Sequence, residues 1–555
     1  MPETPTRSGR AAALVALGIL LSRVAGLVRQ KLFAHFLGSG LEAAAFSAAT
    51  RIPNVLQNLL GEGVLSASFI PVYAGLRAKG QGDEARRMAG AIFGLLTLLV
   101  GVVVGVGLLA APWLVRLIAP GYDGEAFALT VSLVGLIFPG TGVLVLSAWC
   151  LGILNSHKRF FLSYVAPVVW NGAIIAALLL FRASPASELV TWVAWATVAG
   201  SVLQFLVQLP NVLRLLGGFD PRPTLSVPSV REVLKGFGPA VTARGVVQVS
   251  AYVDLALASL VSARAVSVLT YAQTIALLPI SLFGMAISAA ELPEMSADAV
   301  KSASERAAAL KERLQNGLER MAFFVVPSAV AFLLLGDVLC GLLLESGRFT
   351  AKDSRLGWYV LLGSGVALLA QTSGRLFSST LYALKDTRTP LRLAVIRVSL
   401  GVSLGFVSVR FGTQALGLPD DVGVVFLTLV TSLTAWVEMI LLRRAVSRAI
   451  DGVPSITGRL LRLWAAAFLA GGAAVGVKAL FTHTYGARPT ALEEWGGAVL
   501  PFPNMPALVL WRFDVSTVLT CLVLLGVYGA AYFAVTAVMG VPQAGAVLRR
   551  VLRRR

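Results

Sequence analysis

The sequence predicts an all-α polytopic membrane protein with about fourteen transmembrane helices. Hydrophobic residues make up 57% of the 555 residues and charged residues only 14%, whereas a soluble protein has about 25% charged residues. Apolar runs of about 20 residues, long enough to cross a bilayer, recur along the whole chain. They lie near 11–36, 44–75, 89–119, 127–154, 161–182, 189–213, 233–261, 265–292, 318–345, 356–384, 391–411, 421–442, 459–481 and 514–540.

Basic residues are concentrated in every second connection between these runs. They cluster at 77–87, 158–159, 214–235, 301–313, 385–392 and 443–462, and in the C-terminal tail. Because basic connections stay on the cytoplasmic side of a membrane, we expect both termini in the cytoplasm and the 481–513 connection outside. The 346–355 connection fits this pattern least well. The net charge of +19 is therefore explained by basic connections on the cytoplasmic side of a membrane. For this reason we expect no nucleic-acid partner.

An internal repeat with an offset of about 226 residues predicts two homologous halves. Corresponding positions are Pro53 and Pro279, Gly121 and Gly347, and the connections near 154–160 and 382–390. Duplicated helical bundles with a binding site between them are typical of transporters. We therefore predict six-helix lobes at 1–220 and 221–450 around a central cavity. The segment 451–555 adds two further helices and a basic cytoplasmic tail.

Charged side chains occur inside the first two predicted spans. The first span contains Arg23 and Arg29. In the second, residues three or four apart form a polar stripe that consists of Ser47, Arg51, Asn54, Asn58, Glu62 and Ser66. A charge at the centre of a membrane helix costs about 2.5–3.5 kcal/mol, so such residues normally face a protein interior or a watery cavity. We predict that both helices line a cavity; the alternative is that Arg29 and Arg51 extend to the lipid headgroups.

Asp254 lies near the middle of the seventh predicted span. A carboxylate at this depth needs a cation, a proton or an arginine partner. Asp254 is therefore our candidate for a coupling-ion site, and an Asp–Arg pair that joins two helices is the structural alternative. The three histidines match no metal spacing, and the sequence has no Walker A loop or nucleophile elbow. We expect no metal, no resident cofactor and no enzyme activity.

A series of motifs extends along nearly the whole chain. They are SRVAGLVRQ (22–30), RIPNVLQNLLGEGVLSASFIPVYA (51–74), AAPWLVRLIAPGY (110–122), GILNSHKRF (152–160), QLPNV (208–212), FGPA (237–240), SGRFT (346–350) and LKDTRTP (384–390). With these motifs, the sequence resembles the MurJ/MviN lipid II flippases of the multidrug/oligosaccharidyl-lipid/polysaccharide exporter superfamily. The predicted fourteen helices also agree with that family.

The resemblance implies a monomeric protein of the bacterial inner membrane that works by alternating access. It would move undecaprenyl-diphosphate-linked peptidoglycan precursor to the outer leaflet for cell-wall synthesis, with proteins of that process as candidate partners. Arg23 and Arg29 would bind the diphosphate. We add Arg51, Asn54, Glu62 and Arg375 as headgroup contacts, the last because it matches a basic position of the family. The last two helices would form an apolar groove for the prenyl tail.

This sequence departs from the family pattern at several charged positions. Gln57 and Thr274 replace arginines, Gln30 replaces an acidic residue and Ala44 replaces an aspartate. Either Arg51, Arg244 or Arg375 compensates, or the substrate is another lipid-linked oligosaccharide or amphipathic molecule. The excess of arginine disfavours a cationic drug as substrate. The energy source is left open between Na⁺, H⁺ and the membrane potential.

Overall fold

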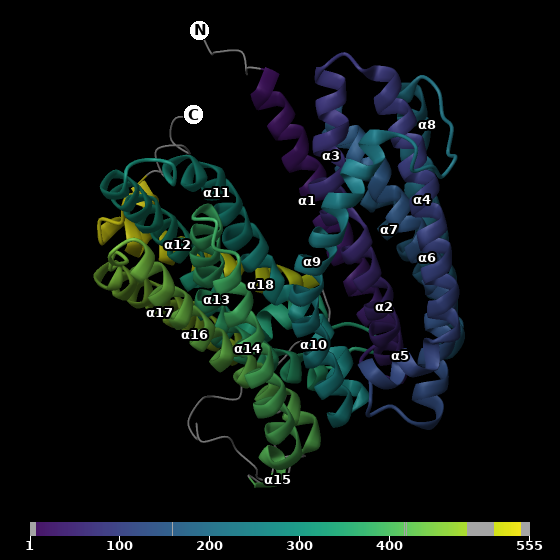
Figure 1. The fold of residues 1–555 in the computed structure, drawn as a ribbon. Helices are drawn as coiled ribbons and strands as arrows, with labels where there is room; N and C mark the ends of the chain where they lie inside the picture. Colours follow the sequence, from purple (N-terminus) through teal and green to yellow (C-terminus); the bar gives the residue numbers. More distant parts are fainter. Residues whose placement is uncertain (1–6, 158, 416, 418, 485–514, 546–555) are drawn as a thin grey trace. The chain divides into compact units, whose positions relative to one another are not determined.

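The computed structural model describes residues 7–157, 159–415, 417, 419–484 and 515–545, which form helices joined by mostly short connections (Figure 1). The first nine are α1 (Arg7–Leu37), α2 (Leu41–Leu60), α3 (Glu62–Ala78), α4 (Gly82–Leu109), α5 (Ala111–Ile118), α6 (Gly124–Ser156), α7 (Phe160–Leu180), α8 (Ala186–Leu216) and α9 (Pro228–Val261). They are followed by α10 (Ala263–Pro279), a π-helix (Ile280–Met285), α11 (Ala286–Asp298), α12 (Ala303–Leu343), α13 (Ala351–Ala383), α14 (Arg388–Val407), α15 (Thr413–Ala415), α16 (Gly423–Ala449), α17 (Thr457–Thr484) and α18 (Val515–Val538).

Among the described residues each predicted span falls mainly on helix, and the predicted all-α polytopic class is confirmed. The third span, which we expected to run from 89 to 119, is divided at Ala110 into α4 and α5. Pro112 at the start of α5 has no N–H to continue the helix from α4, so the expectation of one span is wrong there.

Eleven of the described helices are long and apolar enough to cross a membrane. The helices of the first, second and seventh predicted spans are not among these eleven. In these three spans, α1 contains Arg23 and Arg29, α2 and α3 are separate helices, and the part of α9 whose side chains the structure describes includes the short apolar segment Tyr252–Val261.

The chain forms two compact units, Met1–Ser267 and Val268–Arg555. In the first unit α6 contacts α2, α3, α4 and α8, while α9 packs against α2 and α3. The buried Trp149 of α6 fixes one of these contacts, because its indole N–H donates to the carbonyl oxygen of Ala89 in α4 at 3.1 Å. In the second unit α13 contacts α11, α12 and α16. The predicted lobe boundary near residue 220 and the central cavity stay predictions.

The second predicted span is broken at Gly61, so our expectation of one helix from 44 to 75 is wrong. Pro53 lies inside α2. The amide of Gly61 donates to the carbonyl oxygen of Gln57 at 2.8 Å, which closes the last turn of α2. A Cβ atom at Gly61 would lie 2.2 Å from the same oxygen. Only glycine fits this close approach, and α3 begins at the next residue.

We predict that Gly61→Ala destabilises the protein by about 1–3 kcal/mol, because the added methyl group must displace the backbone around Gln57. Thermal unfolding of the purified protein measures this. Gly75→Ala in α3 is the matched control, since a Cβ atom there meets nothing within 4 Å. Equal unfolding temperatures for the two variants would contradict the steric explanation of the break.

The C-terminal helices contact α12 where its backbone is irregular. Pro327 has no N–H, so the carbonyl oxygen of Phe323, four residues earlier, lacks its helical donor. The Tyr532 hydroxyl of α18 donates to this oxygen at 2.7 Å. The Tyr528 hydroxyl donates to the carbonyl oxygen of Pro327, also at 2.7 Å. Because an unpaired polar group in a bilayer costs several kcal/mol, α18 compensates for the proline of α12.

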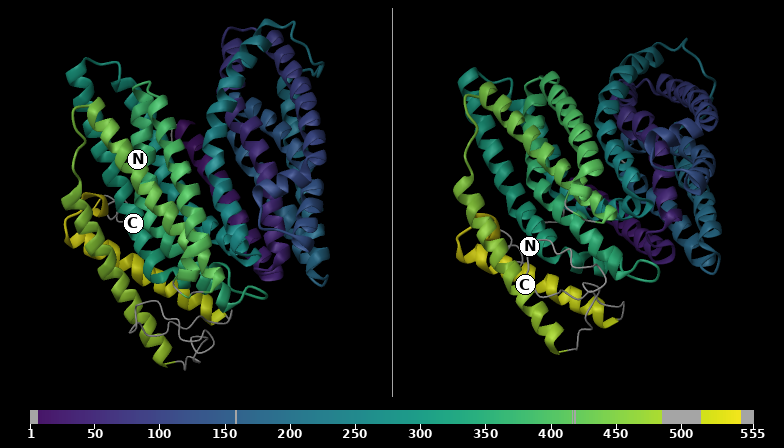
Figure 2. Two further views of the ribbon diagram at one scale, coloured as in Figure 1. Left: turned by 60° about the horizontal axis from the view of Figure 1, so that its bottom comes forward. Right: turned by 90° about the horizontal axis from the view of Figure 1, so that it is seen from below.

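A buried ion pair joins α17 to α12 beyond this proline. Lys478 of α17 contacts Asp337 of α12, and the two side chains are 4% and 2% exposed. The backbone of α12 leaves helical geometry at Leu335 (φ −126°, ψ 17°), just before this pair. The two C-terminal helices lie side by side in both views of Figure 2. They therefore pack on α12 through polar contacts as well as through apolar side chains.

We predict that Tyr532→Phe lowers the free energy of unfolding by about 1–3 kcal/mol, because the Phe323 carbonyl loses its donor inside the membrane. Tyr122→Phe is the control. The Tyr122 hydroxyl is buried and has no hydrogen-bond partner among the described residues, so its removal should be neutral or stabilising. Denaturant or thermal unfolding in detergent compares the two, and an equal effect would argue against the proline-compensation role of α18.

Candidate functional site

The arginines of α1 lie in the first unit, next to α7. Arg23 is exposed and Arg29 is half-buried. The Arg29 guanidinium lies over the ring of Trp170 in α7, with 4.9 Å from its Cζ atom to the ring centroid. Trp170 is itself oriented by α8, since its indole N–H donates to the carbonyl oxygen of Thr197 at 3.2 Å. Three helices thus determine where the Arg29 charge lies.

Neither arginine of α1 has a counter-anion among the residues that the structure describes. No carboxylate of this part of the chain forms an ion pair with Arg23 or Arg29. A cation–π contact orients a cation and contributes about 0.5–2 kcal/mol, but it adds no negative charge. The donors of both guanidinium groups therefore stay available to an anionic ligand.

Arg51 of α2 differs, because it lies close to a carboxylate. It is half-buried, and Asp254 of α9 interacts with it electrostatically. Next to Asp254, the Tyr252 hydroxyl donates to the carbonyl oxygen of Arg51 at 3.4 Å. The structure therefore brings together two residues that are about 200 positions apart in sequence. Arg51 is therefore the arginine partner that the structural alternative for Asp254, a pair joining two helices, required. The role of Asp254 as an ion site stays a prediction.

The structure describes only some of the other residues that we predicted to contact the substrate. Asn54 is exposed on α2. The side chains of Glu62 and Arg244 lie outside the described residues, so the predicted stripe can be followed only along α2. Thr274, which replaces a family arginine, donates its hydroxyl to the Thr270 carbonyl oxygen at 3.0 Å. Its polar group is thus used within its own helix.

Arg375 belongs to the second unit, where it lies exposed on α13. Its charged neighbours are Arg397 of α14 and Glu438 of α16, which pair with each other at 3.1 Å. This pair was not predicted from the sequence, and neither was the pair of Lys478 with Asp337. The signal was present, because all four are charges inside apolar runs. Their pairing was hidden, because each partner lies on a different helix.

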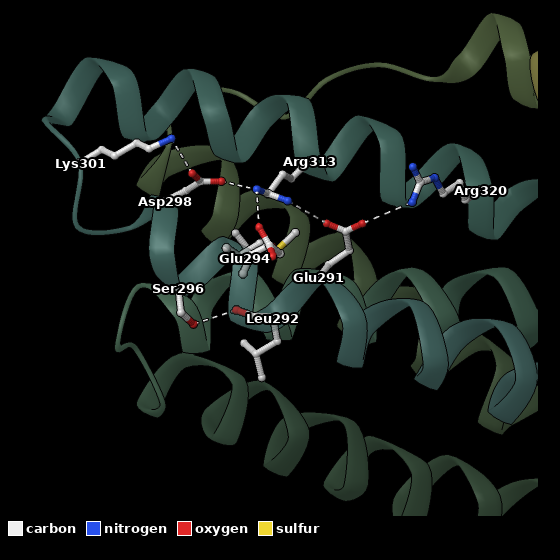
Figure 3. A network of polar contacts seen from close by, with 10 residues as sticks. Glu291, Leu292, Glu294, Ser296, Asp298, Lys301, Arg313 and Arg320 are labelled. Carbon is white, nitrogen blue, oxygen red and sulfur yellow. Dashed lines mark hydrogen bonds and ion pairs between the residues drawn. The ribbon is translucent and has the colours of Figure 1, made fainter. Parts of the chain in front are cut away.

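A further charged cluster joins α11 to α12 (Figure 3). The guanidinium of Arg313 contacts the carboxylates of Asp298 and Glu294, the latter at 2.9 Å. Lys301 contacts Asp298 at 2.6 Å, and Glu291 lies 3.8 Å from Arg320. Because these groups neutralise one another across the turn between the two helices, we interpret the cluster as structural.

The fold defines a class of protein: a membrane protein with many spanning helices. The structure resembles an inward-facing multidrug resistance MATE family transporter of the MOP superfamily, with a TM-score of 0.62 at 17% identity over 80% of this chain and 99% of that one. It also resembles "Lipid II flippase MurJ, inward closed conformation", with a TM-score of 0.72 at 21% identity over 95% of this chain and 98% of that one.

Sequence comparisons identify the family. The family model "Lipid II flippase MurJ" matches residues 33–492. The Burkholderia cenocepacia lipid II flippase MurJ is 34% identical over 70% of this chain and 75% of its own length. A probable lipid II flippase MurJ of Rhizobium tropici is 33% identical over 69% and 72%. The chain therefore belongs to the MurJ lipid II flippase family and is a multi-pass bacterial membrane protein, as the sequence motifs predicted.

We predict that Arg51 and Asp254 are energetically coupled. Each of Arg51→Gln and Asp254→Asn should destabilise the protein, because it leaves the other charge uncompensated at membrane depth. The double variant should then lose less than the sum of the two, with a coupling energy of about 0.5–3 kcal/mol in unfolding. The same cycle between Arg29 and Asp254 is the control, for which we expect additivity. Additivity in both cycles would rule out the pairing.

Proposed function

We propose that this protein moves lipid II, the undecaprenyl-diphosphate-linked peptidoglycan precursor, from the inner to the outer leaflet of the bacterial cytoplasmic membrane. Membership of the MurJ family supports this assignment. The observation on which it rests most is the Arg29 guanidinium, which Trp170 orients and no described carboxylate neutralises. Such a group is suited to an anion that arrives and leaves.

The chemistry of the diphosphate matches this site. A guanidinium donates two parallel hydrogen bonds to the oxygens of a phosphate, and these charge-assisted bonds are stronger than neutral ones. In our proposal Arg23 and Arg29 bind the diphosphate, and the ring of Trp170 limits the rotation of Arg29. Asn54, Glu62 and Arg375 would contact other parts of the headgroup. The prenyl tail would stay in lipid along α17 and α18.

Arg51 contributes differently in this proposal. Because Asp254 offsets part of its charge, Arg51 attracts an anion less strongly than the α1 arginines do. Substrate would compete with Asp254 for the Arg51 donors, and Asp254 would then need a proton or Na⁺. Substrate binding would thus be coupled to the uptake of an ion by Asp254, and substrate release to the loss of that ion. This is the coupling role that we expected for Asp254 from the sequence.

We propose that the membrane potential, besides an ion at Asp254, is a candidate source of energy for the cycle. The substrate headgroup is anionic, and a negative cell interior favours its outward movement. A potential of 100 mV is worth about 2.3 kcal/mol for each elementary charge that crosses fully. The protein would act as a transporter with no catalytic step and no resident cofactor, as a monomer with both termini in the cytoplasm. Alternating access between its two lobes would expose the site to each side in turn.

Two positions favour a second class of substrate, a different lipid-linked oligosaccharide. Gln57 and Thr274 are uncharged where the family has arginines, and the Thr274 hydroxyl already bonds within its own helix. A lipid-linked oligosaccharide with less negative charge than lipid II would need fewer arginines. Its prenyl diphosphate would still require Arg23 and Arg29.

We predict that Arg29→Ala abolishes transport while the protein still folds, and that Arg29→Lys retains part of it. Lysine preserves the charge but not the two-pronged donor geometry. Loss of the charge-assisted pair should weaken substrate binding at least tenfold, which corresponds to about 1.4 kcal/mol. Growth of bacteria depleted of their own lipid II flippase measures the activity. The amount of folded variant in the membrane is measured in parallel.

Arg182→Ala is the matched control, since Arg182 is exposed in the connection between α7 and α8 and should support normal growth. Wild-type growth with Arg29→Ala would leave the diphosphate site without support. Wild-type binding with lost growth would instead place Arg29 in a later step of the cycle.

A further inference from the structure

Buried carboxylates in the second unit almost all have a partner that stabilises their charge. Side chains that are at most 7% exposed contact a cation in three cases: Asp298 with Lys301 and Arg313, Glu319 with Arg459, and Asp337 with Lys478. Asp353 instead accepts hydrogen bonds from the backbone amide and the hydroxyl of Thr350, each at 2.8 Å, as a helix cap. Glu345 is the exception among the described residues of this unit.

Glu345 lies in the turn that connects α12 to α13. Its amide donates to the carbonyl oxygen of Cys340 at 3.1 Å, which ends α12. Phe349 closes the turn, and its ring packs at 5.4 Å, centroid to centroid, against Tyr271 of α10. Glu345 is 6% exposed, and its Oε2 atom has no hydrogen-bond partner in the part of the chain that the structure describes. The turn therefore encloses a carboxyl group without a donor or a cation.

The groups around Glu345 are neutral or acidic. The hydroxyl of Ser354 lies beside the carboxyl without forming a well-aligned hydrogen bond. Asp337 and Asp353 act on it electrostatically, and the sulfur of Cys340 is a further buried neighbour on α12. Lys478, from α17, is engaged with Asp337.

The cations of the turn itself do not pair with Glu345. Arg348 and Lys352 are exposed and Arg355 is half-buried, and no ion pair joins any of them to the Glu345 carboxyl, which retains an unbonded oxygen. A charged Glu345 would therefore be both desolvated and repelled by two neighbouring carboxylates.

These surroundings determine the direction in which the pKa of Glu345 is shifted. Burial, the largest effect, and the two neighbouring acids raise the pKa of Glu345 to about 7, and Ser354 opposes this only in part. A carboxyl whose pKa is higher in the folded protein stabilises the fold at acidic pH. That contribution is lost as the pH rises from the unfolded value, about 4.3, through about 7.

We propose that Glu345 is a proton-binding site, which is occupied below neutral pH and makes the turn between α12 and α13 sensitive to pH. The ligand is a proton and not a metal ion, because no group of three acidic, histidine or cysteine side chains in the described part of the chain is arranged to bind a metal. Ionisation places an unpaired negative charge beside Asp337 and Asp353 and loosens the start of α13. This site is independent of the flippase assignment.

The experiment is thermal unfolding of the purified full-length protein across a pH series, with wild type and Glu345→Gln compared at each pH. The amide of glutamine has the shape of the protonated acid but does not titrate. As the pH is raised through about 7, we expect the unfolding temperature of the wild type to fall relative to that of the variant. The three histidines contribute equally to both proteins and cancel in the difference. Superimposable pH profiles would overturn the proposal.

Ser354→Ala provides a second test that does not depend on how well Glu345→Gln folds. Removal of the one hydroxyl that favours the ionised form should move the midpoint of the pH dependence upward. Infrared spectroscopy supplies an independent readout, since the band of a protonated carboxyl should be present in the wild type at neutral pH and weaker in Glu345→Gln. An unmoved midpoint, or an unchanged band, would contradict the assignment of the proton to Glu345. None of these measurements requires transport activity.

Discussion

The cost of a charge inside a membrane is the constraint on which this structure depends. Each intramembrane cation must have a counter-charge, a watery surrounding or a ligand. In the second unit Arg397 and Lys478 have carboxylate partners on neighbouring helices. In the first unit Arg29 has the ring of Trp170 and no described carboxylate. This difference distinguishes charges that are paired within the fold from Arg29, and it is the physical basis for the diphosphate site that we propose in the first unit.

The same constraint applies to polar groups of the backbone and to protons. The break at Gly61 costs no hydrogen bond at its own amide, because that amide closes the last turn of α2. The carbonyl that Pro327 leaves without a helical donor accepts a hydrogen bond from Tyr532. A buried acid without a cation avoids its charge by binding a proton, as we propose for Glu345. The helices, the C-terminal pair and the titratable turn thus satisfy one requirement in different ways.

Much of the fold could be predicted from the sequence, because hydropathy and alternating basic connections depend on local composition. The described parts of the predicted spans are mainly helical, with breaks at Gly61 and Ala110, and the family motifs identified the family. The break at Gly61 was not predicted, since a tight backbone contact leaves little signal in sequence. Asp254 was recognised as unusual, but its approach to Arg51 depends on how α9 packs on α2. Arg397 and Glu438 were overlooked for the same reason: their charges compensate each other only in three dimensions.

We propose that Arg23 and Arg29 of α1, which pair with no carboxylate that the structure describes, bind the diphosphate of a lipid-linked substrate. An experimental structure of the full-length protein with bound lipid II in a lipid bilayer tests it most directly. We expect phosphate oxygens within hydrogen-bond distance, about 2.7–2.9 Å, of the Arg29 guanidinium nitrogens, with the Trp170 ring still beneath that group. A diphosphate bound elsewhere in the protein, with Arg29 contacting only Trp170, would contradict the account.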